Sequence, residues 1–319
     1  FWDDYLVLKD GRYVSLNDSI CENSGPNTNP ATTVSFIRLL YPSLIEISEL
    51  LGQDEDRRGM WRDIAARMSP FTYIPASSLP FLKNAPAELV KDKFVIRDCE
   101  ANGAEFPRSA YFTYKNRKIT SSSAGMSCVQ AIFPGWSFGI ESDAKEREAA
   151  LSTVTFAAQW YDFNNSCNFY ADAAVAGYDP SEILSNLDAL IDVYEKSDFT
   201  ITTPGGATED VAIIPCALQN MFLQSHQRLI HLFPNWPADQ DAAFGDLPAC
   251  GGFLVGSRKS HGKIDYVKVT SVRGGTCRLA NPWPGSKVKM TGSGPREISG
   301  PELEIPMKAG ETLVLTPAS

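Results

Sequence analysis

Two acidic residues in separate polar loops are the side chains whose positions point first to chemistry. Glu22 lies in a stretch rich in Asn, Ser, Gly and Pro, ahead of a predicted helix. Glu209 follows the run PGGAT (204–208) at the opening of another predicted helix. Two carboxyl groups, one protonated and one ionised, can act as general acid and general base. We predict Glu22 as the acid and Glu209 as the base, with Asp210 as the alternative for the second role.

Each acid also has a simpler structural interpretation. A Glu beside an Asn in a loop, as Glu22 is beside Asn23, is commonly only solvated or a cap. Glu209 and Asp210 follow Thr208, a capping-type residue, and acidic side chains in a first helical turn interact favourably with the helix dipole. On the residues alone, capping is the better interpretation of this second pair.

Five predicted helices, in a first regime that covers residues 30–236, carry these loops. Apolar residues at helical spacing set their limits, and Asn29-Pro30 and Asp179-Pro180 mark two of the starts. The predicted helices are 31–51, 54–68, 144–162, 179–194 and 208–225. The first has Gly52 as its stop and an apolar stripe formed by Val34, Ile37, Leu40, Leu44, Ile47 and Leu51.

A second regime begins near Pro237 and has the pattern of short strands. Apolar residues alternate with polar ones between 252 and 316, and Gly or Pro falls in every gap. Short strands separated by turn signals indicate an antiparallel β-sandwich.

Composition and charge exclude several classes of protein. The formal net charge of −9 argues against a nucleic-acid partner, because such partners require clustered Lys and Arg. No apolar run approaches the roughly 20 residues of a membrane helix, and no secretory signal is present. The first residue is Phe1, which indicates a removed leader or a piece of a longer chain. The seven cysteines include no Cys-x-x-Cys pair. Cys128, Cys167, Cys216 and Cys250 lie in mainly apolar sequence, which favours buried free thiols over disulfides and leaves one long-range bridge as the alternative.

Three stretches resemble family 95 of the glycoside hydrolases, the family that includes the inverting α-L-fucosidases. The first, SICENS (19–24), resembles the family's Ser-Pro-Glu-Asn segment. The second runs from EDVAII (209–214) into NMFLQSH (220–226) and is similar to an acidic residue followed by a buried helix ending in Leu-Gln-Ser-His. The third is IHLFPNWP (230–237) followed by residues 247–255 and Lys263, similar to the entry into the C-terminal β-domain.

The resemblance implies a fold, a domain division and an activity. The fold would be mainly α with a β C-terminal domain: part of an (α/α)6 toroid followed by an antiparallel β-sandwich. Residues 1–236 would be the C-terminal half of the barrel catalytic domain, with its first half missing here, and 237–319 the β-sandwich domain. The activity would be inverting hydrolysis of α-linked fucose- or galactose-type glycans by a secreted or periplasmic enzyme without cofactor or metal.

Departures from the family pattern place fucose specificity in question. Glu209 stands where the family's fucosidases carry the Asp of an Asp-Gly-Asn-Phe-Gly motif, and SCVQAIFPG (127–135) replaces a His-rich segment. The two Asn residues that hold the catalytic water in the family lie upstream of the region that this chain covers.

Sugar recognition requires flat apolar rings and hydrogen-bonding amides. Trp136 in the loop FPGW (133–136) is predicted to stack on a pyranose, and Asn23, Asn164, Asn165 and Asp210 to bind hydroxyl groups. The expected partner is an oligosaccharide or polysaccharide, with no nucleic acid and no membrane.

Two other functions remain open. One is a catalytically inactive carbohydrate-binding or structural extracellular protein on the same toroid, which the altered acidic motif and the missing Asn-bearing region favour. The other is a polysaccharide lyase, for which the chain shows no cluster of a Tyr or His base with a neutralising Arg or Asn. His226 and His231 lack a third ligand at close spacing and are interpreted as structural.

Overall fold

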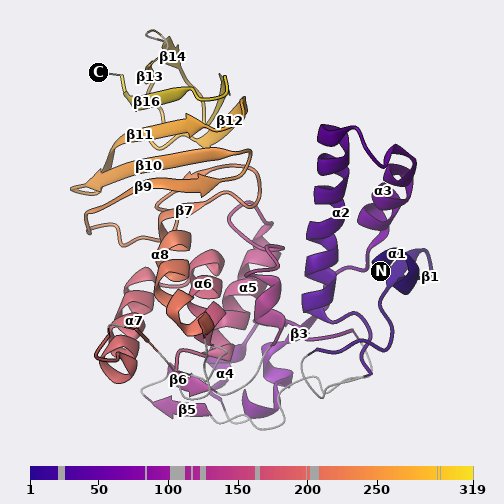
Figure 1. The fold of residues 1–319 in the computed structure, drawn as a ribbon. Coiled ribbons are helices and arrows are strands. Elements are labelled where there is room, and N and C mark those ends of the chain that lie inside the picture. Colours follow the sequence, from indigo (N-terminus) through magenta and orange to yellow (C-terminus); the bar gives the residue numbers. More distant parts are fainter. Residues whose placement is uncertain are drawn as a thin grey trace. The chain divides into compact units, whose positions relative to one another are not determined.

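A computed structural model describes most of the chain, and its contacts divide it into two compact units. The first unit comprises Phe1–Tyr178 and Asn186–Ile213, and the second comprises Asp179–Ser185 and Ile214–Ser319. The structure describes residues 1–20, 26–82, 85–100, 112–115, 118–122, 127–161, 166–198, 200–201, 208–292, 294 and 296–318. Figure 1 traces the elements in chain order.

The first unit is built from helices joined by small two-stranded sheets. Its larger helices are α2 (Ala31–Leu51), α3 (Arg58–Arg67), α5 (Ala144–Ala157) and α6 (Ser166–Ala176); α7 (Pro180–Tyr194) crosses the division between the units. Its shorter helical segments are α1 (Trp2–Tyr5), η1 (Glu55–Arg57), η2 (Ala76–Ser78), η3 (Pro80–Leu82), α4 (Ala87–Val90), η4 (Ser127–Ala131) and η5 (Thr208–Ala212). The paired strands are β1 (Val7–Lys9) with β2 (Arg12–Val14), β3 (Tyr73–Pro75) with β4 (Phe94–Ile96), and β5 (Phe112–Lys115) with β6 (Lys118–Ser122).

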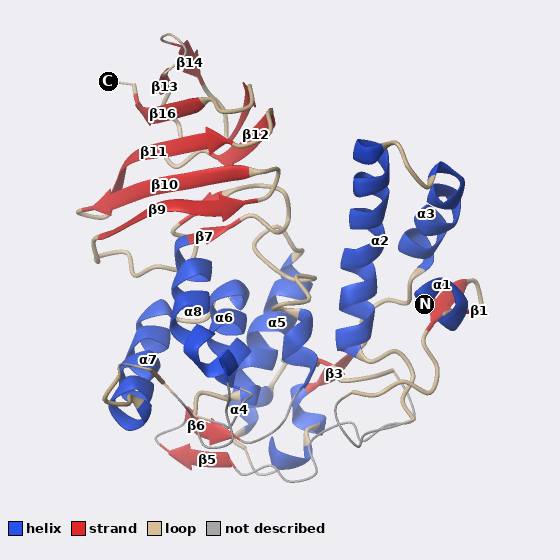
Figure 2. Ribbon diagram, in the orientation of Figure 1, coloured by secondary structure: helices blue, strands red, loops and turns tan. Residues whose placement is uncertain are grey.

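The predicted fold class is wrong. Helices make up 39% of the described residues and strands 27%, so this part of the protein is not mainly α, and it shows no toroid (Figure 2). The error has a physical source. Periodicity detects long amphipathic helices, whereas three-residue strands such as β3 and β4 bury too few residues to leave a pattern. The toroid itself was inferred from the family resemblance, because the five helices predicted from the sequence are too few to form one.

The bounds of helix α2 were predicted correctly from the sequence, but its N-terminal cap was not. Its observed bounds, Ala31–Leu51, are those predicted, and Gly52 ends it in the left-handed conformation with φ of 64°. Asn29 does not cap it, because the Asn29 Oδ1 accepts a hydrogen bond from the Ser15 amide instead.

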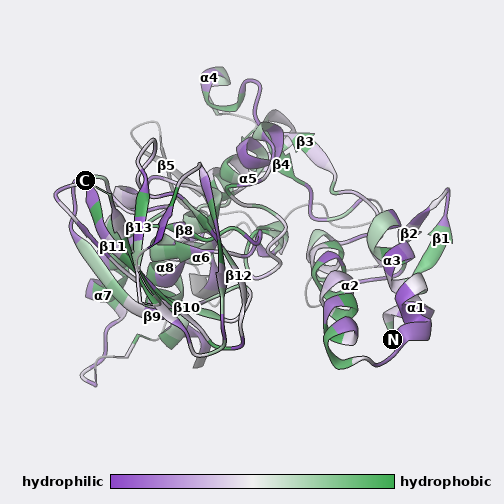
Figure 3. Cartoon of the chain, turned by 90° about the horizontal axis from the view of Figure 1, so that it is seen from above, coloured by the Kyte–Doolittle hydropathy of each residue, from purple (hydrophilic) through white to green (hydrophobic). Residues whose placement is uncertain are grey.

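The predicted stripe of α2 divides between two faces of the helix. Val34 and Ile37 are buried with Tyr41 in a core that also includes Trp61 and Ile64 of α3. A second face carries exposed apolar side chains: Phe36, Leu39, Leu40, Ile47, Leu50 and Leu51. Figure 3 shows the hydrophobic colouring along this helix. Because this helix carries apolar residues on two faces, the spacing of those residues does not show which face is buried.

The second unit is centred on a six-stranded antiparallel sheet with the order β14-β13-β16-β11-β10-β9. Helix α8 (Ile213–Phe222) and the short pair β7 (Leu223–Gln224) and β8 (His231–Leu232) precede it. The strands of the sheet are β9 (Ala242–Ala249), β10 (Phe253–Ser260), β11 (Lys263–Ser271), β13 (Val288–Thr291), β14 (Arg296–Ile298) and β16 (Thr312–Pro317). β12 (Gly275–Ala280) and β15 (Glu302–Met307) form a separate antiparallel pair.

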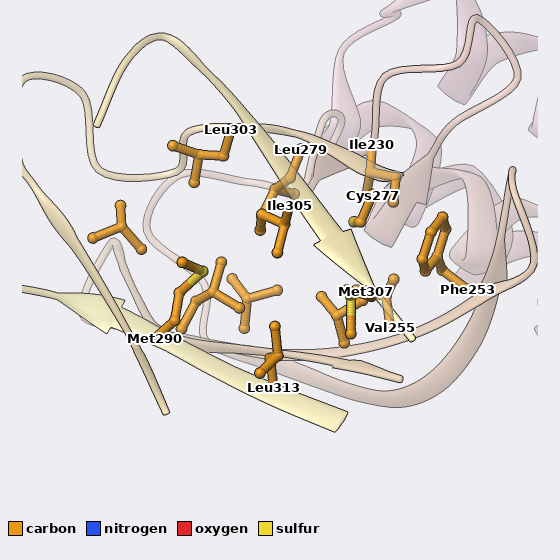
Figure 4. Packing of buried hydrophobic residues seen from close by; sticks show 14 of the residues in the cluster. Ile230, Phe253, Val255, Cys277, Leu279, Met290, Leu303, Ile305, Met307 and Leu313 are labelled. Carbon is orange, nitrogen blue, oxygen red and sulfur yellow. The ribbon is translucent and has the colours of Figure 1, made fainter. Parts of the chain in front are cut away.

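Alternation along these strands builds one apolar core. In β15, Leu303, Ile305 and Met307 are buried, while the residues between them face outward. Figure 4 shows Leu279 and Ile305 of the β12–β15 pair directed toward Leu313 and Met290 of the sheet. The pattern of polar and apolar residues between 252 and 316 therefore predicted the strands themselves correctly.

The β10–β11 hairpin fixes its register with a two-residue turn. Ser260 pairs with Lys263, and the turn residues His261 and Gly262 both have positive φ, of 49° and 75°. Such a turn matches the right-handed twist of the strands.

Candidate functional site

The loop that carries Glu22 is closed by a short bridge between the chain segments on either side of it. Glu22 and Asn23 themselves lie outside the described residues. Asp18 and Asn27 pair in an antiparallel bridge, with backbone N–H···O distances of 3.0 and 2.8 Å. The ends of this loop are therefore held together at its base.

A polar network supports the base of this loop. The guanidinium of Arg12 donates to both carboxylate oxygens of Glu100, and the Asn29 amide donates to Glu100 Oε2 at 2.6 Å. Asn29 Oδ1 in turn accepts from the Ser15 amide at 2.8 Å. Burial raises the pKa of Glu100, but the hydrogen bonds from Arg12 and Asn29 and the charge of Arg12 together outweigh it and leave that pKa below its usual range. Bidentate pairing keeps Glu100 ionised and occupied, so we assign it a structural role.

The second predicted acid lies on the 3-10 segment η5, which packs against helix α6. The predicted helix 208–225 is in fact η5, then α8 up to Phe222, then the strand β7. The two acids of η5 differ in environment, because Glu209 is exposed and Asp210 is only 1% exposed. Glu209 is the one open to a ligand from solvent.

Trp136 ends a tight turn that packs closely against α2. The turn follows η4, and its amides bond back to it: Gly135 N–H to Gln130 O at 2.8 Å and Trp136 N–H to Ile132 O at 3.1 Å. A Cβ on Gly135 would lie 2.3 Å from the Ser35 hydroxyl oxygen and 2.6 Å from the Gln130 carbonyl oxygen. Only glycine fits at this position. The half-buried Trp136 takes a positive φ of 53°, and its ring lies 5.9 Å from that of Phe133.

Two buried aspartates hold η4 and this turn in place. Asp98 Oδ1 accepts a hydrogen bond from the Cys128 amide at 2.7 Å, and Asp172 Oδ1 accepts one from the Phe133 amide at 2.9 Å. Asp98 is 2% exposed and Asp172 is 0% exposed. The turn that presents Trp136 is thus anchored to α6 through Asp172, and η4 is anchored to the segment after β4 through Asp98.

Burial controls the protonation of both anchoring aspartates. It raises the pKa of Asp98 to about 7, although the Cys128 amide bond opposes the shift. It raises the pKa of Asp172 well above its ordinary value, again against an opposing backbone bond. Asp172 Oδ2 has no hydrogen-bond partner among the described residues, which agrees with a neutral carboxyl group that avoids the cost of a buried charge.

The remaining predicted residues divide between described and undescribed parts of the chain. Asn164 and Asn165 lie outside the described residues, so their role in binding hydroxyl groups stays a prediction. The same holds for the convergence of Glu22 with Glu209. Trp160 is buried against Phe169, with ring centroids 4.8 Å apart.

The described part of the chain contains neither a metal-binding cluster nor a membrane-spanning helix. No group of three or more His, Cys, Asp or Glu there is placed to hold a metal ion. None of the helices in that part has the length and apolar character needed to cross a membrane. Cys128 is buried as a free thiol, as expected, whereas Cys250 is exposed, contrary to the expectation from its neighbours.

Sequence reasoning missed Asp98 and Asp172. Asp172 lies alone within the apolar run FYADAAVA (169–176), and Asp98 follows the buried strand β4. A single acid inside an apolar segment was the available signal, because such a residue must find a hydrogen-bond partner when it is buried.

No protein-family model and no curated protein sequence matches this chain.

Proposed function

We propose that this protein is a glycoside hydrolase that acts on α-linked fucose- or galactose-type glycans with inversion, with Glu209 and Glu22 as its two carboxyl groups. The observation that carries the proposal is the difference in exposure between the two neighbouring acids of η5. Glu209 is exposed next to a buried Asp210, on a segment packed against α6. The position of Glu209, fourteen residues ahead of Leu223, where the LQSH stretch begins, agrees with that of the acid in the resembled family.

The chemistry needs one group on each face of the scissile bond. In this proposal Glu22 protonates the leaving oxygen, and Glu209 removes a proton from the attacking water. Inverting enzymes keep the two carboxyl groups roughly 6.5 to 9.5 Å apart, which leaves space for that water. The half-buried Trp136, on its anchored turn, supplies a ring for stacking on the sugar.

The proposal does not require the toroid that the sequence resemblance implied, and it is tested by turnover. The intact chain is assayed with aryl α-L-fucoside and aryl α-galactoside, beside Glu209→Gln and Glu22→Gln. Removal of a general acid or base costs roughly 10²- to 10⁴-fold in rate. Glu55→Gln, which removes an exposed acid from the 3-10 segment η1, is the matched control and is expected to keep full activity.

The assay also separates the alternative function. Turnover lost in both variants and kept in the control supports the hydrolase. Tight glycan binding with no turnover by the intact chain would instead support a catalytically inactive carbohydrate-binding protein. Turnover unaffected by Glu209→Gln would remove Glu209 from the proposal.

A further inference from the structure

A pocket in the second unit combines a buried cation with aromatic and proline side chains. It has a volume of about 440 Å³, within the range of small-molecule sites. Strand β10, the β10–β11 turn and the segment after β12 supply most of its lining. The residues that matter for recognition are Lys259, Lys263, Trp283, Phe233 and Ile264.

Lys259 is the unusual member of this lining. Phe253, Val255, Ser257 and Lys259 occupy the buried positions that alternate along β10, so the lysine stands on the core side of the strand. It is 8% exposed, and its ammonium donates to the Pro237 carbonyl oxygen at 2.8 Å. An ammonium group has three donors, and Lys259 forms no ion pair with any described residue.

A buried lysine without a counterion is costly to the fold. Desolvation accordingly lowers the pKa of Lys259, and the carboxylates of Asp239 and Asp241 oppose that shift only in part. Both aspartates are exposed, and neither lines the pocket. An anionic group bound in the pocket would supply the missing counterion and take the unused donors. The exposed Lys263 at the same pocket adds a second positive charge.

Trp283 gives the pocket a fixed flat surface. Its indole N–H donates to the Ile264 carbonyl oxygen at 2.8 Å, and its backbone amide donates to Asn281 Oδ1 at 2.9 Å. Pro282 and Pro284 flank it and restrict the backbone. An indole held in this way, half-buried at a pocket wall, presents an apolar face on which the C–H groups of a pyranose can stack.

We propose that this pocket binds an acidic sugar, a pyranose bearing a carboxylate, with the carboxylate at Lys259 and Lys263 and the ring against Trp283. The site lies entirely within the second unit and shares no residue with the proposed hydrolytic acids. It would hold a glycan chain at a position of its own, and its occupancy does not depend on turnover at Glu209.

Calorimetric titration of the intact chain tests the site with three probes: a galacturonate trisaccharide, a neutral galactose trisaccharide of the same linkage, and inorganic sulfate. The acidic trisaccharide is expected to bind, and the other two to bind at least about ten-fold more weakly, since a hydrogen bond to a charged group contributes about 1.5–3 kcal/mol. Equal binding of the neutral trisaccharide, or of sulfate, would overturn the proposal, as would no binding of the acidic one.

The affinity of single-residue variants for the acidic trisaccharide shows whether binding occurs in this pocket. Lys259→Met keeps most of the side-chain volume and removes the charge, and is expected to weaken the acidic trisaccharide at least about ten-fold. Lys263→Met alters only an exposed side chain, so it tests the charge without risk to the core. Lys289→Met, on the exposed face of β13 and outside the pocket, is the control. Thermal unfolding verifies that each variant is folded. Affinity that is unchanged in both pocket variants, or reduced equally in Lys289→Met, would refute the assignment.

Discussion

The buried carboxyl group of Asp98 should make the stability of this protein fall as the pH rises. Its pKa is raised from an ordinary 3.8 to about 7 by burial. Below pH 4 the group is protonated in both the folded and the unfolded state and carries no penalty. Between pH 4 and 7 the unfolded chain releases the proton while the folded chain retains it, so folding becomes less favourable. Roughly three pH units between the two pKa values correspond to a loss on the order of 4 kcal/mol by pH 8.

Asp98→Asn removes the titration and keeps the contact, because an amide oxygen can still accept the Cys128 N–H bond of 2.7 Å. Urea unfolding at pH 5, 6, 7 and 8 is expected to show a free energy of unfolding that falls less with pH in the variant than in the wild type. Asp172 contributes a dependence of the same sign to both proteins, so the difference between them isolates Asp98. Asp56→Asn, at an exposed site, is the control and should follow the wild type. Parallel curves for wild type and Asp98→Asn would refute the reasoning.

Two further pairs of substitutions, each a buried position with an open control, test the packing of the two units. Gly135→Ala places a Cβ within 2.3 Å of the Ser35 hydroxyl oxygen and should lower the free energy of unfolding by about 1–3 kcal/mol. Gly59 lies in α3 with open space around it, so Gly59→Ala should raise the free energy of unfolding by about 0.5–1 kcal/mol. Equal effects in chemical denaturation would contradict the packing of the Trp136 turn. Leu315→Ala, at a fully buried position of β16, should cost about 2–5 kcal/mol, and Leu50→Ala, at a position 63% exposed on α2, should stay within about 0.5 kcal/mol. A large loss from Leu50→Ala alone would mean that the exposed face of α2 is covered in the native protein.

Local structure followed from the sequence where one physical signal dominated. The bounds of α2 follow from its apolar periodicity and its glycine stop, and Asp179 caps α7 by accepting from the amides of Ser181 and Glu182, as predicted. Strands β13, β15 and β16 of the second unit follow from the alternation of buried and more exposed residues. In each case the pattern repeats over many residues, or a capping side chain can accept hydrogen bonds only from the free amides of the first helical turn.

Other elements left no such signal. Helix α6 is apolar nearly all round, from Phe169 to Val175, so it has no periodic stripe, and it was not predicted. The pairing of β3 with β4 rests on three residues a side. Lys259 is buried, whereas the pattern of polar and apolar residues would place a charged side chain on the exposed face of the strand. Its environment depends on the Pro237 carbonyl and on Trp283, which are brought to it by the fold.

The two predicted acids illustrate what the sequence conveys about a site. The residue types and the resemblance selected Glu209 and Asp210 together, and only the structure separated an exposed acid from a buried one. Side-chain exposure at a helix start depends on which segment packs against it, here α6 against η5. The anchors of the Trp136 turn were missed for the same reason, since they act through backbone amides distant in the chain.

The stereochemistry of the first product tests the proposed function most directly. Proton NMR of the intact chain acting on an aryl α-glycoside distinguishes the anomer released before mutarotation. An inverting pair of carboxyl groups, with Glu209 activating water opposite the leaving group, predicts the β-anomer first and its loss in Glu209→Gln. Release of the α-anomer first, or no sugar released at all, would contradict the proposal.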